Sequence, residues 1–243
     1  EGANVFADLF TEPVSQDVLQ IVGGELPGAG ATFESHTGKT FTIHRTIDLN
    51  KNTYFRDHAI NGTPVIPYAA ATAWFAEAAT ALYPSHQLNK CFDSKLYKGL
   101  TFEKAESLEL TMVLNVTSAN ASEVILSGHI ESKSPKGLPL KHYACSVSLV
   151  KNKQPIPSVD IDLIHQKAIL DGDKLYSDGS LFHKDYYKGI GDVYVLHEKS
   201  IQYKAYLPEV SREVQGQFPL DPVNSALLDV QFQGFLAWEK QMN

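Results

Sequence analysis

The stretch Arg56-Asp-His-Ala-Ile-Asn-Gly-Thr-Pro-Val-Ile-Pro-Tyr68, followed at once by an Ala-rich apolar segment to Tyr83, is the most informative part of this chain. Its skeleton is His58, then Gly62 four residues later, then Pro67 five residues after that. Pro67 predicts the start of a helix, because the first helical turn does not need the N–H that proline lacks. The predicted helix is small or apolar around most of its circumference, which is typical of a helix wrapped by other structure.

Strand-like patterns surround this helix. Before it, residues 40–48 alternate between apolar and polar side chains, which predicts a half-buried strand. After it come three runs rich in β-branched residues and separated by short turns, at 107–117, 122–132 and 138–150. Together they predict an antiparallel meander that curls around the Ala-rich helix.

The second half of the chain repeats this order loosely. A Pro-bearing linker is followed by strand-like segments at 192–196 and 199–206, and helical periodicity covers 225–240. The pattern therefore indicates a loose duplication. The predicted division is an N-terminal extension or linker at 1–35, a first unit with the His58 motif at 36–150, a linker at 151–165, and a second unit at 166–243.

The composition favours a soluble enzyme or part of one. At 243 residues the chain can bury a substantial core, and 43% hydrophobic and 20% charged residues are ordinary for a folded protein. The net charge of −7 argues against nucleic-acid binding and against electrostatic membrane docking. Cys91 and Cys145 are too few for a disulfide scaffold. No secretory signal is visible and the first residue is Glu1 rather than Met, so we expect a cytoplasmic segment of a longer protein.

One potential base and one potential acid lie near the starts of the two apolar helices. Neutral imidazole is the commonest biological base, although a single His before a helix is often only structural. Asp229 and Gln233 are four residues apart and share a helix face. Asp229 follows two leucines, and apolar surroundings raise the pKa of a carboxyl group toward that of a useful acid. The alternatives are an Asp that only interacts with the helix dipole and an exposed Gln.

His58-x-x-x-Gly62-x-x-x-x-Pro67, with a distal Asp229-x-x-x-Gln233, resembles the dehydratase domains of polyketide synthases and polyunsaturated-fatty-acid synthases. The stretch from Leu175 to His183 is similar to the approach to that family's His-Gly-Pro-x-Phe-Gln segment. The resemblance covers residues 40–243. It implies an α+β double hotdog, in which two curved antiparallel sheets each wrap around a long central helix.

The resemblance also implies an activity. The substrate would be a β-hydroxyacyl thioester carried by the phosphopantetheine of an acyl carrier protein. His58 would take the α proton, and Asp229, oriented by Gln233, would protonate the departing hydroxyl. No cofactor and no metal would be needed, and neighbouring synthase domains and a homodimer are the further partners implied, with no nucleic acid and no membrane. The implied substrate-binding residues are Gly62, Pro67, Tyr68, Phe182 and Tyr187, with backbone N–H groups near Gly62 and Tyr68 facing the thioester oxygen.

This chain departs from the family in three places. Tyr68 stands where many relatives have Gly, and Lys184-Asp185 replaces the Gly-Pro of the third motif. The chain ends soon after Asp229, so we expect the second hotdog to be incomplete, with its helix covered by a second protomer, by residues 1–35 or by further C-terminal sequence. Double-bond isomerisation, cyclisation as in product-template domains, and a non-catalytic acyl-binding or scaffold role stay open as alternatives.

Overall fold

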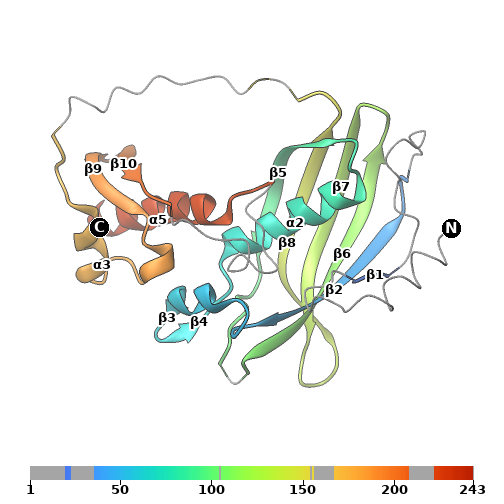
Figure 1. Ribbon diagram of the computed structural model, residues 1–243, viewed down its shortest axis with the longest axis horizontal. Helices are drawn as coiled ribbons and strands as arrows, with labels where there is room; N and C mark the ends of the chain where they lie inside the picture. Colours follow the sequence, from blue (N-terminus) through green and yellow to red (C-terminus); the bar gives the residue numbers. More distant parts are fainter. Residues whose placement is uncertain are drawn as a thin grey trace.

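Six antiparallel strands form one curved sheet in the first half of the chain (Figure 1). The computed structural model describes residues 20–22, 36–103, 105–153, 155, 167–207 and 222–242. The spatial order of the strands is β1-β2-β6-β7-β8-β5. Their bounds are Gln20–Val22 for β1, Thr40–Asp48 for β2, Gln87–Leu96 for β5, Ser107–Ala119 for β6, Glu123–Lys133 for β7 and Pro139–Val150 for β8.

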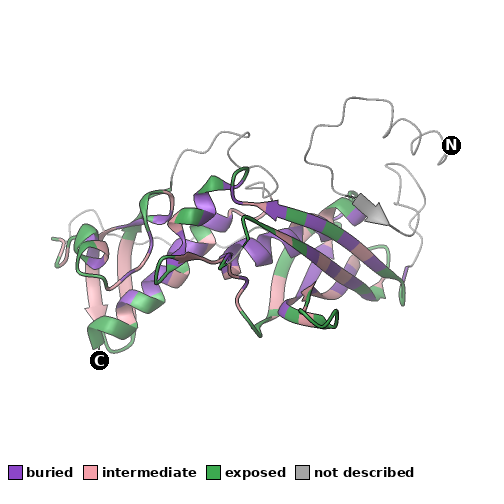
Figure 2. Cartoon of the chain, turned by 90° about the horizontal axis from the view of Figure 1, so that it is seen from below, coloured by how far each residue is buried: buried purple, intermediate pink, exposed green. Residues whose placement is uncertain are grey.

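The predicted strand at 40–48 and the predicted meander are both confirmed, since β6, β7 and β8 pair in sequence order. Alternation between buried and exposed residues along these strands follows the two-residue period of the sequence (Figure 2). Strand β5 was not predicted. It is an edge strand with mostly polar residues and an irregular register near Asp93, whose φ is 50°, so the periodic signal is lost. Within the segment 1–35, β1 adds a further edge to β2.

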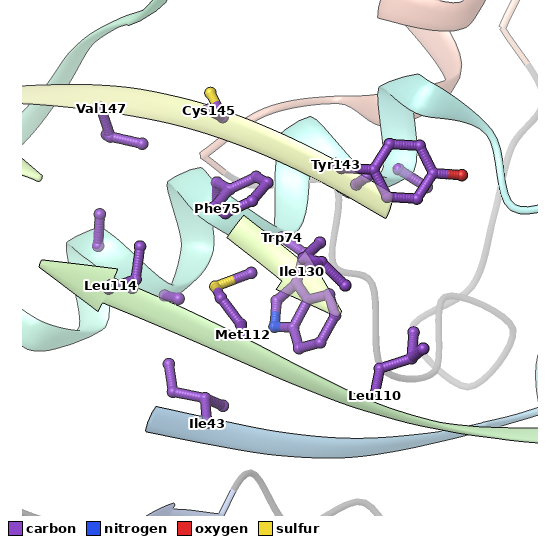
Figure 3. Packing of buried hydrophobic residues seen from close by; sticks show 14 of the residues in the cluster. Ile43, Trp74, Phe75, Leu110, Met112, Leu114, Ile130, Tyr143, Cys145 and Val147 are labelled. Atoms are coloured by element: carbon purple, nitrogen blue, oxygen red, sulfur yellow. The ribbon is translucent and has the colours of Figure 1, made fainter. Parts of the chain in front are cut away.

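Helix α2 (Tyr68–Leu82) lies against the sheet, as the Ala-rich pattern predicted. Its small side chains let the strands approach closely, and two of its large ones, Trp74 and Phe75, pack among Met112 and Leu114 of β6 (Figure 3). The close approach is also required on the sheet side. A Cβ added at Gly128 of β7 would lie 2.6 Å from the backbone oxygen of Val113 and 3.2 Å from Cε1 of Phe75, so a larger residue would press on both the neighbouring strand and the helix.

Helix α5 (Ser225–Met242) is the centre of the second half. Strands β9 (Ile190–His197) and β10 (Ser200–Ala205) form an antiparallel pair beside it, and α3 (Gly172–Ser177) packs against β9. Both predicted strands and the predicted helix are therefore present. A separate apolar cluster holds this half together, made of Leu175, Leu181, Ile190, Val193, Val230 and Ala237.

The outer side of α5 is only partly covered by the described residues. Phe235 is 67% exposed and Leu236 is 39% exposed. Trp238 is half-buried, and its indole N–H donates a hydrogen bond of 2.8 Å to the carbonyl of His197. Two strands therefore cover one side of the helix. What was expected to cover the rest stays a prediction, because residues 1–19 and 23–35 lie outside the described part, as does most of the linker at 151–165.

The two halves meet where α2 and α5 pack against each other. Between β2 and α2, the chain forms a short 3-10 helix, η1 (Thr53–Asp57), and a hairpin of β3 (Ala59–Ile60) and β4 (Thr63–Pro64). A second 3-10 turn, η2 (Asp185–Tyr187), contacts η1 from the other half. These pieces bring the two sequence motifs to one place. Among the described residues, no helix combines the length and apolar character needed to span a bilayer.

Candidate active site

His58 lies between η1 and β3, and its side chain is almost fully buried. Its Nδ1 is 2.9 Å from the carbonyl oxygen of Val65. A carbonyl oxygen can only accept, so Nδ1 carries the proton of the neutral ring and Nε2 keeps a free lone pair. The hairpin of β3 and β4 holds this geometry, because Val65 N donates in turn to the carbonyl of His58 at 2.9 Å. The local fold thus makes Nε2 the basic nitrogen of the His58 ring.

Asp229 and Gln233 lie one turn apart on α5, and both are buried. Gln233 Nε2 donates to Asp229 Oδ2 at 2.8 Å and to the carbonyl of Tyr187 at 2.7 Å. The other oxygen, Asp229 Oδ1, is 3.9 Å from His58 Nε2. The imidazole of the first half and the carboxyl group of the second half therefore face each other directly.

Burial changes the pKa of both groups. Desolvation lowers the pKa of His58 to about 4, with the hydrogen bond to Val65 acting in the opposite direction. Desolvation raises the pKa of Asp229 to about 6, opposed by the hydrogen bond from Gln233. The site therefore favours a neutral imidazole and a carboxyl group that holds its proton more tightly than an exposed one.

Tyr176 of α3 fixes the orientation of the Gln233 amide. Its hydroxyl donates to Gln233 Oε1 at 2.7 Å and accepts from the backbone N–H groups of Gly189 and Ile190, each at 2.9 Å. With its oxygen occupied by this donor, the Gln233 amide must present its NH₂ group to Asp229. Hydrogen bonds between uncharged groups, from the backbone N–H groups through Tyr176 to Gln233, thus orient the carboxyl group of Asp229.

His183 completes the group, and the set of site residues predicted from sequence did not include it. Its Nε2 is 3.5 Å from Asp229 Oδ2, and its ring stacks on Phe182 with centroids 4.0 Å apart. Its Nδ1 is buried and has no hydrogen-bond partner among the described residues. Burial, followed by the nearby His58, lowers the pKa of His183 to about 3. Its position at the end of the third sequence motif was the signal that could have identified it.

These side chains border a cavity of about 570 Å³, here called the site cavity. It lies between the two halves, and apolar and aromatic side chains form most of its wall. Such a lining suits an acyl chain with a few polar groups at the reacting atoms. The lining residues are His58, Ile60, Val65, Ile66, Tyr68, Leu96, Gly99, Tyr143, Phe182, His183, Asp229, Phe232, Gln233, Phe235 and Leu236.

The imidazoles of His58 and His183 and the Asp229 carboxylate also have ligand atoms within 4.8 Å of one another. Two imidazoles and a carboxylate are a donor set that a divalent transition metal accepts. Among the described residues they are the group that could hold such an ion. The same nitrogen and oxygen atoms face each other across the site, so a metal bound there would leave them unable to transfer protons.

Comparison with known proteins shows what this chain is similar to in sequence. Residues 27–128 match the family model described as the polyketide synthase dehydratase domain. Over 211 residues the chain is 26% identical to one large chain of the polyunsaturated fatty acid synthase of Thraustochytrium sp.. The match covers 84% of this chain but only 7% of that much longer protein. This chain is similar to the dehydratase domains of these synthases.

Solved structures show the same fold. The dehydratase domain from the CurF module of the curacin polyketide synthase superposes with a TM-score of 0.63 at 17% identity, covering 88% of this chain and 75% of that one. A trans-AT polyketide synthase dehydratase domain from Brevibacillus brevis gives a TM-score of 0.61 at 18% identity, covering 83% and 76%. The predicted α+β double hotdog is confirmed, with α2 and α5 as its two central helices.

Of the other predicted site residues, some line the site cavity and others do not. Tyr68, the first residue of α2, and Phe182 both line the site cavity. Pro67 is the N-cap of α2 and is buried at the helix start, outside the lining. Pro67 therefore lies at the helix start beside Tyr68, and its expected substrate-binding role stays a prediction.

The structure places Gly62 and Tyr187, two of the predicted substrate-binding residues, outside the lining of the site cavity. Gly62 is exposed at the tip of the β3–β4 hairpin and does not line the site cavity. Asn61 and Gly62 both have positive φ, 51° and 81°, which a type I′ hairpin turn requires, so the turn explains the glycine. Tyr187 is buried behind His58, with ring centroids 5.4 Å apart, and is not part of the lining. Its contribution is the backbone carbonyl that binds Gln233.

Proposed function

We propose that this chain removes water from a β-hydroxyacyl thioester to give an α,β-enoyl thioester. The observation that carries this proposal is the 3.9 Å approach of His58 Nε2 and Asp229 Oδ1 across the site cavity. A base whose lone pair is defined and an acid whose pKa is raised are the two groups that a β-elimination requires. The similarity to synthase dehydratase domains supports the same reaction.

In this mechanism, His58 Nε2 takes the proton from the carbon next to the thioester carbonyl. The electron pair of that C–H bond forms the new double bond, and the C–O bond of the β-hydroxyl breaks. Asp229 gives its proton to the departing oxygen, which leaves as water. The site is then an imidazolium facing a carboxylate, and return of the proton from Nε2 to Oδ1 restores the starting state. Protons are conserved over the cycle.

Negative charge develops on the thioester oxygen as the α proton leaves. We place this oxygen at the start of α2, because the first N–H groups of a helix have no acceptor within it and Tyr68 borders the site cavity. The exposed turn at Gly62 is not available for this role. The partial positive charge of the helix N-terminus acts in the same direction.

We propose that the acyl chain arrives on the phosphopantetheine arm of an acyl carrier protein that belongs, with neighbouring catalytic domains, to one cytoplasmic synthase. This follows from the likeness to part of a polyunsaturated fatty acid synthase and to domains of modular synthases. The homodimer suggested by the family resemblance stays a prediction. It would also provide one way to cover the exposed side of α5.

The test is to incubate the chain with a β-hydroxyacyl carrier-protein thioester and to follow loss of one water by mass spectrometry. His58→Ala and Asp229→Asn are each expected to lower turnover by at least about a hundredfold, the usual scale for losing a general base or acid. Near-wild-type turnover by either variant would overturn the assignment. If no water is lost, an enoyl carrier-protein thioester is offered instead, and a product with the same mass but a different retention time would indicate double-bond isomerisation.

A further inference from the structure

Two cavities meet at one pair of aromatic rings. Besides the site cavity, the structure contains a cavity of about 480 Å³, here called the second cavity. Of the described residues, Tyr68 and Phe232 are the two that line both. Their ring centroids are 5.6 Å apart. Because both side chains line both cavities, the Tyr68–Phe232 pair forms the boundary between them. The other lining residues of the second cavity are Thr72, Leu88, Cys91, Phe92, Ser94, Val223 and Leu228.

Each ring of this pair lies close in sequence to a residue that holds or orients a proposed catalytic group. Tyr68 begins α2, three residues after the Val65 carbonyl that binds His58. Phe232 directly precedes Gln233 on α5. The pair therefore forms part of the wall of the site cavity, with one ring from each half of the fold. The Tyr68 ring is also near that of Tyr143, with centroids 6.2 Å apart, which restricts its movement on one side.

The second cavity has the lining of a site for an apolar chain. No charged side chain from the described part of the chain borders it, and its wall consists of aliphatic and aromatic carbon, one thiol and two hydroxyls besides that of Tyr68. The Ser94 side chain interacts with the Tyr68 hydroxyl, and burial raises the pKa of Tyr68. The tyrosine therefore directs its polar end toward β5. A charged or strongly polar ligand would lose its hydration here without compensation, whereas a hydrocarbon chain would not.

We infer that the Tyr68–Phe232 pair sets the length of acyl chain that the site accepts, with the second cavity as the place for the distal end of a longer chain. This inference rests on the proposed dehydratase function. In the wild-type chain, a short acyl group ends at the pair and fits the site cavity. A longer one must pass between the two rings, and the work of separating them lowers its efficiency.

The experiment measures kcat/KM for saturated β-hydroxyacyl carrier-protein thioesters of short, medium and long chain length. Tyr68→Ala and Phe232→Ala open the pair from opposite halves, so a folding defect in one leaves the other as a test. Each is expected to raise the ratio of long-chain to short-chain kcat/KM by about tenfold, the scale of one or two methylene groups in an apolar pocket. Tyr97→Ala removes a 57% exposed tyrosine that borders neither cavity and should leave the ratio unchanged.

A second variant tests the destination of the chain. Adding Cys91→Trp to Tyr68→Ala fills the second cavity from β5, and it should reverse the gain for long chains without affecting short ones. Unchanged chain-length ratios in both single variants, with turnover retained, would overturn the inference and leave the dehydratase proposal intact.

Binding gives a readout that does not depend on catalysis. A fluorescent long-chain fatty acid, cis-parinaric acid, should bind at least about tenfold more tightly to Tyr68→Ala than to the wild-type chain, with Cys91→Trp again reversing the gain. If the wild-type chain dehydrates no thioester of any length, the dehydratase proposal fails. The fatty-acid affinities then decide the role of the pair alone, and equal affinities would overturn it.

Discussion

Gln233 donates a hydrogen bond of 2.8 Å to Oδ2 of Asp229, which leaves Oδ1 as the oxygen that faces the site cavity. Because Oδ2 already accepts this bond, the acidic proton of Asp229 is best carried by Oδ1. That proton then points toward the base and toward any hydroxyl bound between them. An amide does this without adding charge, so the carboxyl group is oriented while burial still raises its pKa.

The plot of the dehydration rate against pH should be bell-shaped. His58 must be neutral and Asp229 must be protonated, and their pKa values are about 4 and about 6. We therefore expect kcat/KM to rise as His58 loses its proton near pH 4 and to fall as Asp229 loses its proton near pH 6. Rates measured over this range, with far-UV circular dichroism at each pH to show that the fold persists, check it. A rate that keeps rising above pH 7 would contradict the assignment of Asp229 as the acid.

Asp229→Asn should stabilise the fold while removing activity. The pKa of Asp229 is raised from 3.8 to about 6, so the folded state holds this proton more tightly than the unfolded chain does. Stability from this group is fully present below pH 3.8 and is lost as the pH rises through about 6. At pH 7 the loss is about 3 kcal/mol, at about 1.36 kcal/mol for each pKa unit. The neutral variant avoids it, because it has no charge to desolvate and its side-chain oxygen can still accept from Gln233.

Urea unfolding at pH 4 and pH 7 measures this effect. The difference in unfolding free energy between variant and wild type should be larger at pH 7 than at pH 4. Asp173→Asn, at an exposed position on α3, is the matched control and should show no such pH-dependent difference. A variant that is less stable than the wild type at pH 7 would show that the buried carboxylate is not a source of instability.

Tyr176→Phe should reduce both stability and turnover. The variant loses the donor to Gln233 and leaves the N–H groups of Gly189 and Ile190 without their acceptor. An unsatisfied buried donor costs about 1–3 kcal/mol, so we expect a loss of unfolding free energy on that scale. Turnover should fall because the amide of Gln233 is free to rotate. Tyr97→Phe, which removes an exposed hydroxyl, is the control, and equal unfolding midpoints for the two variants would contradict this network.

His183→Phe should change the pH profile more than the fold. Phenylalanine keeps a planar ring to stack on Phe182 but has no nitrogen beside Oδ2 of Asp229. Loss of this polar neighbour makes ionisation of Asp229 harder, so the falling limb of the kcat/KM profile should move to higher pH. Unfolding should be little affected, because Nδ1 of His183 is buried with no hydrogen bond to the described part of the chain. An unchanged falling limb would limit His183 to a packing role.

Local patterns in the sequence determined most of the fold. The two-residue period of β2, β6, β7 and β8 and the apolar circumference of α2 can be recognised from the residues themselves, because each reflects burial on a known face. His58, Asp229 and Gln233 could be selected in the same way, by residue type and by spacing along a helix. Strand β5 could not, since an edge strand with a bulge buries too little of either face to leave a periodic pattern.

Only the tertiary structure decided how these residues meet. The sequence places His58 and Asp229 far apart, and their 3.9 Å approach results from the packing of α2 against α5. The same packing brings His183 and Tyr176 into the network, and it leaves Gly62 and Tyr187 outside the cavity wall. Spacing along a chain reports which neighbours share a helix face. It carries no information on which faces from distant segments come together, because that depends on the shapes and volumes of all the side chains between them.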